Sequence, residues 1–237
     1  MVKILVIRLS SIGDIVLTTP VIRCLKEQGD DYEVHTLTKP QYSSIYKNNP
    51  HVDEVHEWGA DSGLILKKLK QLRFDYVIDL HRNIRTQKIK STLKTNSHTF
   101  PKLNVQKWLY VNFKVNRLPD IHIVDRYFEA VKELDVVNDN KGLDFFIDDS
   151  SEVSKDKLTG GKDYVCFAIG AQFNTKKLPP VKLAEIIKEL DKPIVIIGGK
   201  EDKSTSEELS KLLTEKQIIN TTGTYSIEGS ASIVKQA

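Results

Sequence analysis

The stretch that decides the fold is RLSSIGDIVLTTP, residues 8–20. The apolar run directly before it, KILVIRL (3–9), has the length and composition of a buried parallel strand. In many α/β proteins the loop after such a strand carries several glycines that bind phosphate. This loop instead contains one glycine and the carboxylate of Asp14. The stretch therefore predicts an α/β fold and raises the question of what Asp14 does at this position.

Strand and helix signals alternate along the rest of the chain, which is typical of βα units around parallel sheets. Further strands are expected at 32–38, 52–58, 75–81, 163–171, 192–202 (with a loop) and 217–223. Helices are expected at 15–28, 40–49, 62–73, 123–136, 180–191, 206–216 and 226–237. Pro20 leaves two possibilities for the first helix. Either it begins at Pro20 with Thr19 as its cap, or it begins near Asp14 and bends at Pro20.

The polar segment 145–163 is rich in Asp, Ser, Lys and Gly and predicts a domain boundary. We expect a domain at 1–155 and a second one at 156–237. The second domain has three predicted strands, whereas a doubly wound sheet has about five or six. The sequence is therefore expected to stop inside that domain, which makes it a fragment of a longer protein.

Composition predicts a soluble cytoplasmic protein. Of 237 residues, 40% are hydrophobic and 28% are charged, and the longest apolar runs are too short to span a bilayer. The N-terminus lacks the pattern of a signal peptide. Cys24 and Cys166 lie in apolar segments without metal-ligand spacing, so we expect reduced core thiols.

Several chemistries are excluded by missing motifs. The first loop lacks G-x-G-x-x-G, and the second strand ends in TLTK without the acidic residue that binds ribose, which argues against an NAD-dependent oxidoreductase. Neither a P-loop nor a G-x-S-x-G nucleophile elbow occurs. The six histidines show no H-x-x-x-H or similar spacing, which predicts no metal site.

From the residues alone, two roles remain open for Asp14. It either stabilises the start of the following helix as a first-turn carboxylate, or it acts as a general base that takes a proton from an incoming hydroxyl.

Six blocks of the sequence, in order, resemble glycosyltransferase family 9, the ADP-heptose:lipopolysaccharide heptosyltransferases. The first is KILVIRLSSIGDIVLTTPVIRCLK, which is similar to the N-terminal signature of the family. The others are FDYVIDLHRNIRTQ (74–87), HIVDRYFEAVKEL (122–134), AIGAQFNTKKLPPVKLAEII (168–187), IIGGKEDKSTSEEL (196–209) and NTTGTYSIEGSASIVKQA (220–237). The last block resembles the segment just before the family's Asp-x-Thr-Gly…His donor motif.

The resemblance implies a GT-B fold, in which two Rossmann-like domains face a cleft, with the acceptor on the N-terminal domain and the nucleotide-sugar on the C-terminal one. It implies an inverting, metal-independent transferase that uses no cofactor and takes ADP-heptose as its donor substrate. Asp14 would be the general base that deprotonates the acceptor hydroxyl. One departure from the family pattern lies in the donor loop. The family follows its donor-loop Lys with Arg-Trp-Pro, whereas this chain has Lys177-Leu178-Pro179.

The resemblance also implies donor-binding residues in the second domain. Lys176 aligns with the family's lysine that stands near the leaving diphosphate, and Glu201 with a glutamate near the donor nucleoside. The plainer alternatives are solvated surface lysines and an ordinary βα turn. The complete predicted donor set is Asn174, Thr175, Lys176, Gly198, Gly199 and Glu201.

Acceptor binding is expected around the first loop and the end of the strand at 75–81. Arg82 and Arg85 are placed nearest the cleft, and His81 and His122 are further candidates. The complete predicted acceptor set is Ser10, Ser11, Gly13, His81, Arg82, Arg85 and His122.

Positive charge is concentrated between His81 and Leu118, where nine Lys/Arg occur without any Asp or Glu. The rest of the chain has 26 basic and 32 acidic residues, so the net charge of +3 hides a strong asymmetry. Aromatic side chains are interleaved with these cations. The segment 82–117 is either a solvated face, a nucleic-acid site or a surface for an anionic glycolipid at the inner membrane. We favour the last and expect no nucleic-acid partner, because no nucleic-acid-binding fold is indicated.

The sequence thus predicts a heptosyltransferase-type enzyme of lipopolysaccharide or related glycolipid assembly, cytoplasmic and peripherally bound to the inner membrane. Two alternatives stay open: a non-catalytic sugar- or nucleotide-binding protein of the same fold, and a GT-B transferase with another nucleotide-sugar. The sequence stops before the donor motif, which leaves open whether this chain is active on its own.

Overall fold

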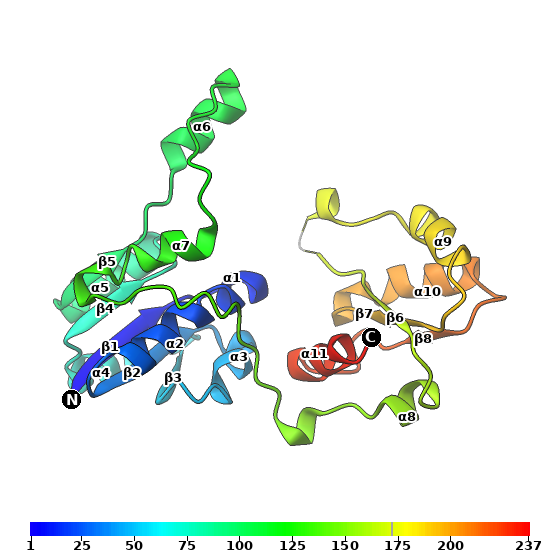
Figure 1. Cartoon of the computed structure of the whole chain (residues 1–237), viewed down its shortest axis with the longest axis horizontal. Helices are drawn as coiled ribbons and strands as arrows, with labels where there is room; N and C mark the ends of the chain where they lie inside the picture. Colours follow the sequence, from blue (N-terminus) through cyan, green and yellow to red (C-terminus); the bar gives the residue numbers. More distant parts are fainter. Residues whose placement is uncertain (172) are drawn as a thin grey trace. The chain divides into compact units, whose positions relative to one another are not determined.

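The computed structural model describes residues 1–171 and 173–237, and the chain forms two units, Met1–Phe146 and Ile147–Ala237 (Figure 1). Each unit has its own parallel sheet and its own buried core.

The sheet of the first unit has the strand order β3-β2-β1-β4-β5, and all its neighbours pair in parallel. Its strands are β1 (Val2–Ile7), β2 (Tyr32–Thr38), β3 (Glu54–Glu57), β4 (Tyr76–Asp79) and β5 (Asn96–Thr99). The order reverses at β1, since β2 lies on one side of it and β4 on the other. Ligands of open α/β sheets bind at such a reversal, beyond the carboxyl ends of the strands. Ile7 pairs with Asp79 at this end, so the loops after β1 and β4 start side by side.

Helices cover this sheet and bury β1 completely from Ile4 to Ile7. One core joins Leu5 and Ile7 of the sheet to Leu69 and Ile89 of the helices. Full burial of such an aliphatic side chain contributes about 1.5–3 kcal/mol. The helices of the first unit are α1 (Ile12–Val16), α2 (Thr19–Gln28), α3 (Ser44–Lys47), α4 (Ser62–Leu72), α5 (Ile84–Leu93), α6 (Asn104–Phe113) and α7 (Ile123–Phe128).

Two helices, α1 and α2, follow the Asp14 loop where one was predicted. Thr18 is the residue before α2, Thr19 is its first residue, and Pro20 occupies the second helical position, where a missing N–H is tolerated. The Thr18 hydroxyl donates to the Ile15 carbonyl at 2.6 Å and so satisfies an acceptor at the end of α1. Neither predicted possibility is fully right. The second helix does start beside the proline, but Thr19 belongs to the helix and is not its cap. The interruption between the two helices also lies before Pro20, not at it.

Two further elements differ from the expectation. The basic stretch contains an edge strand, β5, whose polar sequence NSHT gave no strand signal. The helix predicted over 123–136 ends at Phe128 and is followed by a short 3₁₀ turn, Lys132–Leu134, after which Asp135 adopts a positive φ of 56°. That left-handed residue ends the 3₁₀ turn, which residues 129–131 separate from α7.

The second unit is a three-stranded parallel sheet in the order β6-β7-β8. Its strands are β6 (Val165–Ala168), β7 (Ile194–Ile197) and β8 (Ile218–Asn220). Its helices are α8 (Lys155–Thr159), α9 (Pro180–Lys188), α10 (Lys203–Leu212) and α11 (Ile227–Lys235). All of β7 is buried, because one face packs on α9 and α10 and the other on Tyr164 and Ile233.

The division between the units falls after Phe146, inside the polar segment 145–163 but before residue 155, where the sequence placed it. The reason is Val153, which is buried in a core cluster with Tyr164 and Ile233 and donates its N–H to Ser232 Oγ at 3.0 Å. Residues 147–155 therefore pack on the second sheet.

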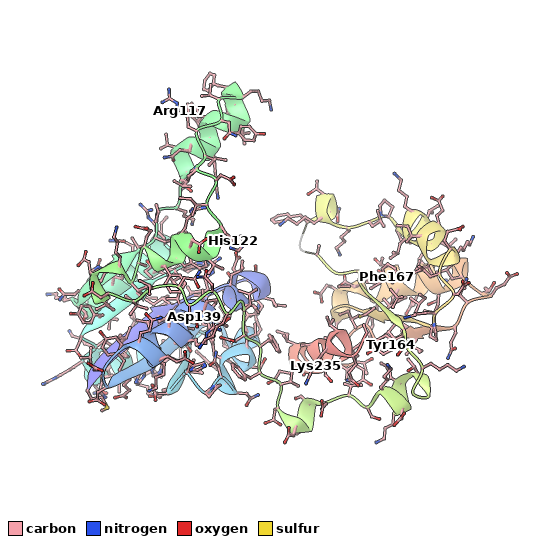
Figure 2. The ribbon with its side chains drawn as sticks, viewed as in Figure 1. Arg117, His122, Asp139, Tyr164, Phe167 and Lys235 are labelled. Atoms are coloured by element: carbon pink, nitrogen blue, oxygen red, sulfur yellow. The ribbon has the colours of Figure 1, made fainter. Side chains whose placement is uncertain are left out.

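One buried arginine fixes the end of the first unit. Arg23 of α2 is 4% exposed and donates to both carboxylate oxygens of Asp139 at 2.8 Å; Figure 2 labels Asp139. It also pairs with the Asp144 carboxylate and donates to the Gly142 carbonyl at 3.0 Å. The hydrogen bonds from Arg23 hold the pKa of Asp139 far below its usual range. The segment from Asp139 to Asp144, which contains neither helix nor strand, is thus held against α2.

Candidate active site

Asp14 lies in the first turn of α1, directly beyond the carboxyl end of β1. The N–H and hydroxyl of Ser11 donate to its Oδ2 atom at 3.3 and 3.0 Å. This is the helix-stabilising role that the sequence allowed. The Asp14 side chain is nevertheless 42% exposed, so this role leaves part of the carboxylate open to a ligand.

The ion-pair partner of Asp14 is Arg8, the residue that follows β1. Its Nη2 atom lies 2.8 Å from Asp14 Oδ2. The same guanidinium donates to the carbonyls of Ser10 at 2.8 Å and Leu80 at 2.5 Å, and to the Tyr127 hydroxyl at 3.1 Å. Arg8 is only 8% exposed. Because its donors are already bound to fixed partners, we infer that Arg8 orients the Asp14 carboxylate and does not bind substrate itself.

These contacts keep Asp14 ionised. Partial burial alone would raise the pKa of Asp14, but the Arg8 charge and the Ser11 hydrogen bonds outweigh it, and the pKa lies below its usual range. The ion pair and both hydrogen bonds are made by Oδ2, which leaves Oδ1 outside these contacts. An ionised and oriented carboxylate of this kind is suited to accept a proton from a bound hydroxyl.

The loop after β4 is held by Asp79, which is fully buried at the end of that strand. Its Oδ1 atom accepts the backbone N–H groups of His81 at 3.1 Å and Arg82 at 2.7 Å, and its Oδ2 atom lies 3.1 Å from Lys90 Nζ. The turn places Arg82 at a positive φ of 51°. Asp79 therefore fixes the backbone of two predicted acceptor-binding residues.

His81 borders the Asp14 site. Burial, followed by the positive charge of Arg8, lowers the pKa of His81 to about 4, so its ring is neutral at neutral pH. Its Nδ1 atom is buried and makes no hydrogen bond within the described part of the chain. The Asp14 charge acts on the same ring. The pairing of β1 with β4 therefore brings His81 near Asp14, and its role in acceptor binding stays a prediction.

The remaining predicted acceptor residues lie at the same end of the sheet but are not all equally available. Ser11 and Gly13 are exposed in the Asp14 loop. The Arg82 guanidinium donates to the Phe100 carbonyl at 3.0 Å, whereas Arg85 is exposed in the first turn of α5. We infer that Arg85 has the greater freedom to meet an anionic ligand.

His122, labelled in Figure 2, starts α7, and its Nδ1 atom accepts the Val124 N–H at 3.3 Å. This contact gives His122 a helix-capping role, and its acceptor role stays a prediction. The same helix carries Tyr127, whose hydroxyl reaches Arg8. Sequence reasoning missed both Arg8 and Tyr127 as parts of the site. The signal available for Arg8 was a charged residue at the end of an otherwise apolar strand.

In the second unit the two adjacent lysines after β6 have different surroundings. Lys177 Nζ lies 2.8 Å from Oδ1 of Asp202, which is 2% exposed. Lys176 is exposed and ends a 3₁₀ turn that also contains Asn174 and Thr175. Lys177 is therefore committed to neutralising a buried carboxylate, and Lys176 is the lysine open to a ligand.

The predicted glycines lie where Asp202 folds back on the end of β7. The Gly199 N–H donates to Asp202 Oδ2 at 3.0 Å, and an added Cβ on Gly198 would lie 3.1 Å from the Asp202 Cβ. Gly223, in the loop after β8, donates its N–H to the Gly198 carbonyl at 2.9 Å. Glu201 is exposed at the same loop. The loops after all three strands thus meet at one edge of this sheet, as the predicted donor set requires.

The basic segment places its apolar side chains in solvent. No residue of α6 is buried, and the helix stands away from the sheet of its unit in Figure 1. Its most exposed apolar residues are Val105 (68%), Val111 (66%), Phe113 (61%) and Trp108 (56%). Among the described residues, none of the helices has both the length and the apolar character needed to cross a membrane.

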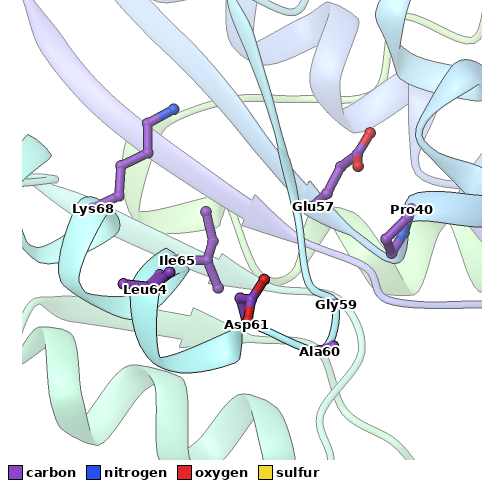
Figure 3. A pocket seen from close by; sticks show the side chains of 8 residues that line it. All are labelled: Pro40, Glu57, Gly59, Ala60, Asp61, Leu64, Ile65 and Lys68. Atoms are coloured by element: carbon purple, nitrogen blue, oxygen red, sulfur yellow. The ribbon is translucent and has the colours of Figure 1, made fainter.

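An open pocket of about 560 Å³ lies elsewhere in the first unit (Figure 3). It is formed beyond β3 and along the start of α4, and its lining contains none of the predicted site residues. The lining residues are Pro40, Glu57, Gly59, Ala60, Asp61, Leu64, Ile65 and Lys68.

Solved structures with the same fold define the class of protein. A glycosyltransferase family 9 protein from Veillonella parvula superimposes with a TM-score of 0.77 at 22% identity, and the match covers 99% of this chain and 74% of that one. Heptosyltransferase II of E. coli has a TM-score of 0.74 at 16% identity, and the match covers 99% of this chain and 77% of that one. E. coli heptosyltransferase WaaC with ADP has a TM-score of 0.69 at 17% identity, with 99% of this chain and 79% of that one covered. The fold is therefore that of the GT-B glycosyltransferases, as predicted.

The sequence comparison identifies the family. The model of glycosyltransferase family 9 (heptosyltransferase) matches residues 64–237, so the chain belongs to this family and the predicted resemblance is confirmed. Lipopolysaccharide heptosyltransferase 1 of Campylobacter coli is 27% identical over an alignment of 218 residues that covers 83% of this chain. The chain spans 64% of the length of that relative.

Proposed function

We propose that this protein transfers a heptose or a similar sugar from an ADP-sugar to a lipopolysaccharide-core or related glycolipid acceptor, with inversion at the anomeric carbon. The observation that carries the proposal is the Asp14 carboxylate. It is ionised, held through Oδ2 by Arg8 and Ser11, and located at the reversal of strand order in a chain of family 9.

In the proposed mechanism Asp14 Oδ1 accepts the proton of an acceptor hydroxyl. The hydroxyl oxygen forms a bond to the anomeric carbon while the bond from that carbon to the diphosphate oxygen breaks, and the electron pair leaves with ADP. A carboxylate with a lowered pKa is a weak base, so proton transfer has to accompany C–O bond formation and cannot precede it. Arg8 is the group that keeps the carboxylate in place for this step.

The leaving diphosphate gains negative charge as the bond breaks, and stabilising that charge lowers the barrier. In the proposal Lys176 supplies a positive charge, and Glu201 binds the donor ribose. Gly198 and Gly199 allow the donor to approach the backbone closely. No metal ion is required by this scheme, since Lys176 takes the part of the cation.

The acceptor in this proposal is an anionic lipid at the cytoplasmic face of the inner membrane. Lys107 and Lys114 flank the exposed apolar side chains of α6. Cations near an anionic membrane contribute on the order of 1 kcal/mol each, and aromatic side chains favour the interface. Arg85 would then contact carboxylates or phosphates of the glycolipid core.

The test is to incubate the protein with ADP-heptose and a lipopolysaccharide-core acceptor and to follow ADP release and the acceptor mass together. Stoichiometric ADP release with one added sugar supports the proposal. ADP binding measured by calorimetry without any turnover favours the alternative of a non-catalytic binding protein. Turnover with another nucleotide-sugar but not with ADP-heptose favours a different transferase of the same fold.

A further inference from the structure

The outer pair of strands in the first sheet carries a side-chain cluster that has no part in the proposed transfer. It consists of His35 from β2 and Glu54 and His56 from β3. One ligand atom of each residue lies within 4.8 Å of those of the other two. Both imidazoles are 1% exposed, while Glu54 is 38% exposed and gives access from solvent.

The spacing of these atoms suits a small metal ion. His35 Nδ1 lies 2.9 Å from His56 Nε2 and 3.5 Å from Glu54 Oε2. Ligand atoms of a tetrahedral Zn²⁺ ion with bonds of about 2.0–2.1 Å lie about 3.3 Å apart. One separation is slightly shorter than this and the other slightly longer, and the ligand atoms of His56 and Glu54 lie within 4.8 Å of one another, so the side chains would have to move only locally to admit the ion. Phe74 packs edge-on against both rings and fixes their planes.

The hydrogen bonds around the cluster determine which nitrogen carries a proton. His35 Nε2 lies 2.7 Å from Glu33 Oε1, so this nitrogen is the N–H donor and Nδ1 carries a lone pair. The partner of that lone pair is then the Nε2–H group of His56. His56 Nδ1 is left as a buried acceptor without a hydrogen bond, facing the Glu54 Oε1 atom at 3.7 Å. A buried acceptor without a donor is destabilising, whereas Glu54 Oε1 is itself paired with Lys68 Nζ at 2.7 Å.

A bound metal would occupy the point toward which both rings direct a nitrogen. If the metal takes His35 Nδ1, His56 Nε2 and Glu54 Oε2, the His56 proton moves to Nδ1 and no proton is released. Glu54 Oε1 stays paired with Lys68 Nζ at 2.7 Å. The Glu33 carboxylate on His35 Nε2 is the outer-sphere contact that metal-binding histidines usually make.

We propose that the His35–Glu54–His56 cluster is a binding site for a divalent transition metal ion, best fitted by Zn²⁺. Two imidazoles and one carboxylate are a common zinc ligand set that leaves a fourth position for water. Magnesium and calcium are disfavoured, because they prefer oxygen ligands. The metal would join the edge strand β3 to its neighbour β2.

The experiment is calorimetric titration of chelator-treated, metal-free protein with ZnCl₂, together with the visible absorption of the Co²⁺-loaded protein. We expect one Zn²⁺ per chain, a tetrahedral Co²⁺ spectrum and a higher Tm of the zinc-loaded protein. Glu54→Gln should weaken binding at least about tenfold, and Glu33→Gln about 10–100-fold as an outer-sphere change. Glu54 is partly exposed, so its variant tests the site even if a His56→Asn variant fails to fold.

The matched control is His98→Gln, which alters a histidine 3.5 Å from a glutamate, Glu133, outside the cluster. This variant should bind Zn²⁺ like the wild type. The proposal is overturned if the wild type shows neither binding heat nor a Co²⁺ spectrum. It is equally overturned if Glu54→Gln and the wild type bind with the same affinity, because the metal would then be held elsewhere.

Discussion

The substitution Asp14→Asn removes the proposed proton acceptor of the active site while keeping the size of the side chain. The asparagine keeps the size of the side chain and an oxygen that can still accept from Ser11, but it cannot take a proton. A general base contributes about 10²–10⁴-fold to the rate. We therefore expect kcat to fall by about that factor, while the affinity for ADP, which the second unit is proposed to bind, stays within about twofold.

The structure predicts a small effect on stability. The ion pair that Asp14 loses is 42% exposed on the carboxylate side but only 10% exposed on the arginine side, so we expect a loss of about 1–2 kcal/mol, between that of an exposed and that of a buried pair. Arg8 keeps its bonds to Ser10, Leu80 and Tyr127. A loss of that size lowers Tm by only a few degrees.

The assay is the initial rate of ADP release with saturating donor and acceptor, measured beside calorimetric ADP binding and thermal unfolding. The matched control is Asp125→Asn, since Asp125 is also an acidic residue in the first turn of a helix of the same unit. It should retain the wild-type rate. If Asp14→Asn keeps more than about a tenth of wild-type turnover, or if its loss of rate is matched by unfolding, the assignment of Asp14 as the base is wrong.

Three other variants test neighbouring parts of the account. Lys176→Ala should lower kcat/KM about 10–100-fold with little change in Tm. Lys177→Ala leaves Asp202 buried without its cation and should chiefly lower Tm. Kinetics and melting curves of both variants test this, and the opposite assignment of the two effects would contradict it. The pKa of His81 is lowered to about 4 in the folded state, so this histidine binds fewer protons there than in the unfolded chain. The free energy of unfolding should therefore fall by on the order of 2–3 kcal/mol as the pH drops from 7 to 4. Denaturant unfolding of His81→Gln should show less of this loss, and an unchanged pH dependence would argue against it. The double substitution of Trp108 and Phe113 by Ser should reduce the fraction of protein that sediments with anionic vesicles about tenfold, without altering ADP binding. If the variant sediments like the wild type, α6 is not the membrane contact.

The fold could be predicted from the sequence because apolar periodicity and turn residues are local signals. The runs KILVIRL and PIVIIGG both form buried strands, and the family was identified from motifs in order along the chain. The strand β5 gave no such signal, since NSHT is polar and lies at an edge where little burial is needed. The end of α7 at Phe128 gave no sequence signal either, because apolar residues continue beyond it as far as Val136.

The candidate site was predicted in part. Asp14 and His81 could be placed near one another because adjacent parallel strands end at the same edge of a sheet. The role of Arg8 could not be predicted, because it depends on the Leu80 carbonyl and the Tyr127 hydroxyl, which come from distant segments. The His35–Glu54–His56 cluster also escaped the search for metal motifs. Glu54 and His56 follow His35 by 19 and 21 residues, and only the register of β2 against β3, with His35 opposite Glu54, brings them together.

The most direct test of the central claim is the anomeric configuration of the transferred sugar. In the proposed single displacement, the acceptor oxygen deprotonated by Asp14 attacks from the face opposite the diphosphate. Nuclear magnetic resonance of the product, read from the one-bond C1–H1 coupling, should therefore show the configuration opposite to that of the donor. A product that retains the donor configuration would contradict the account, because it requires an intermediate step that this arrangement of Asp14 does not provide.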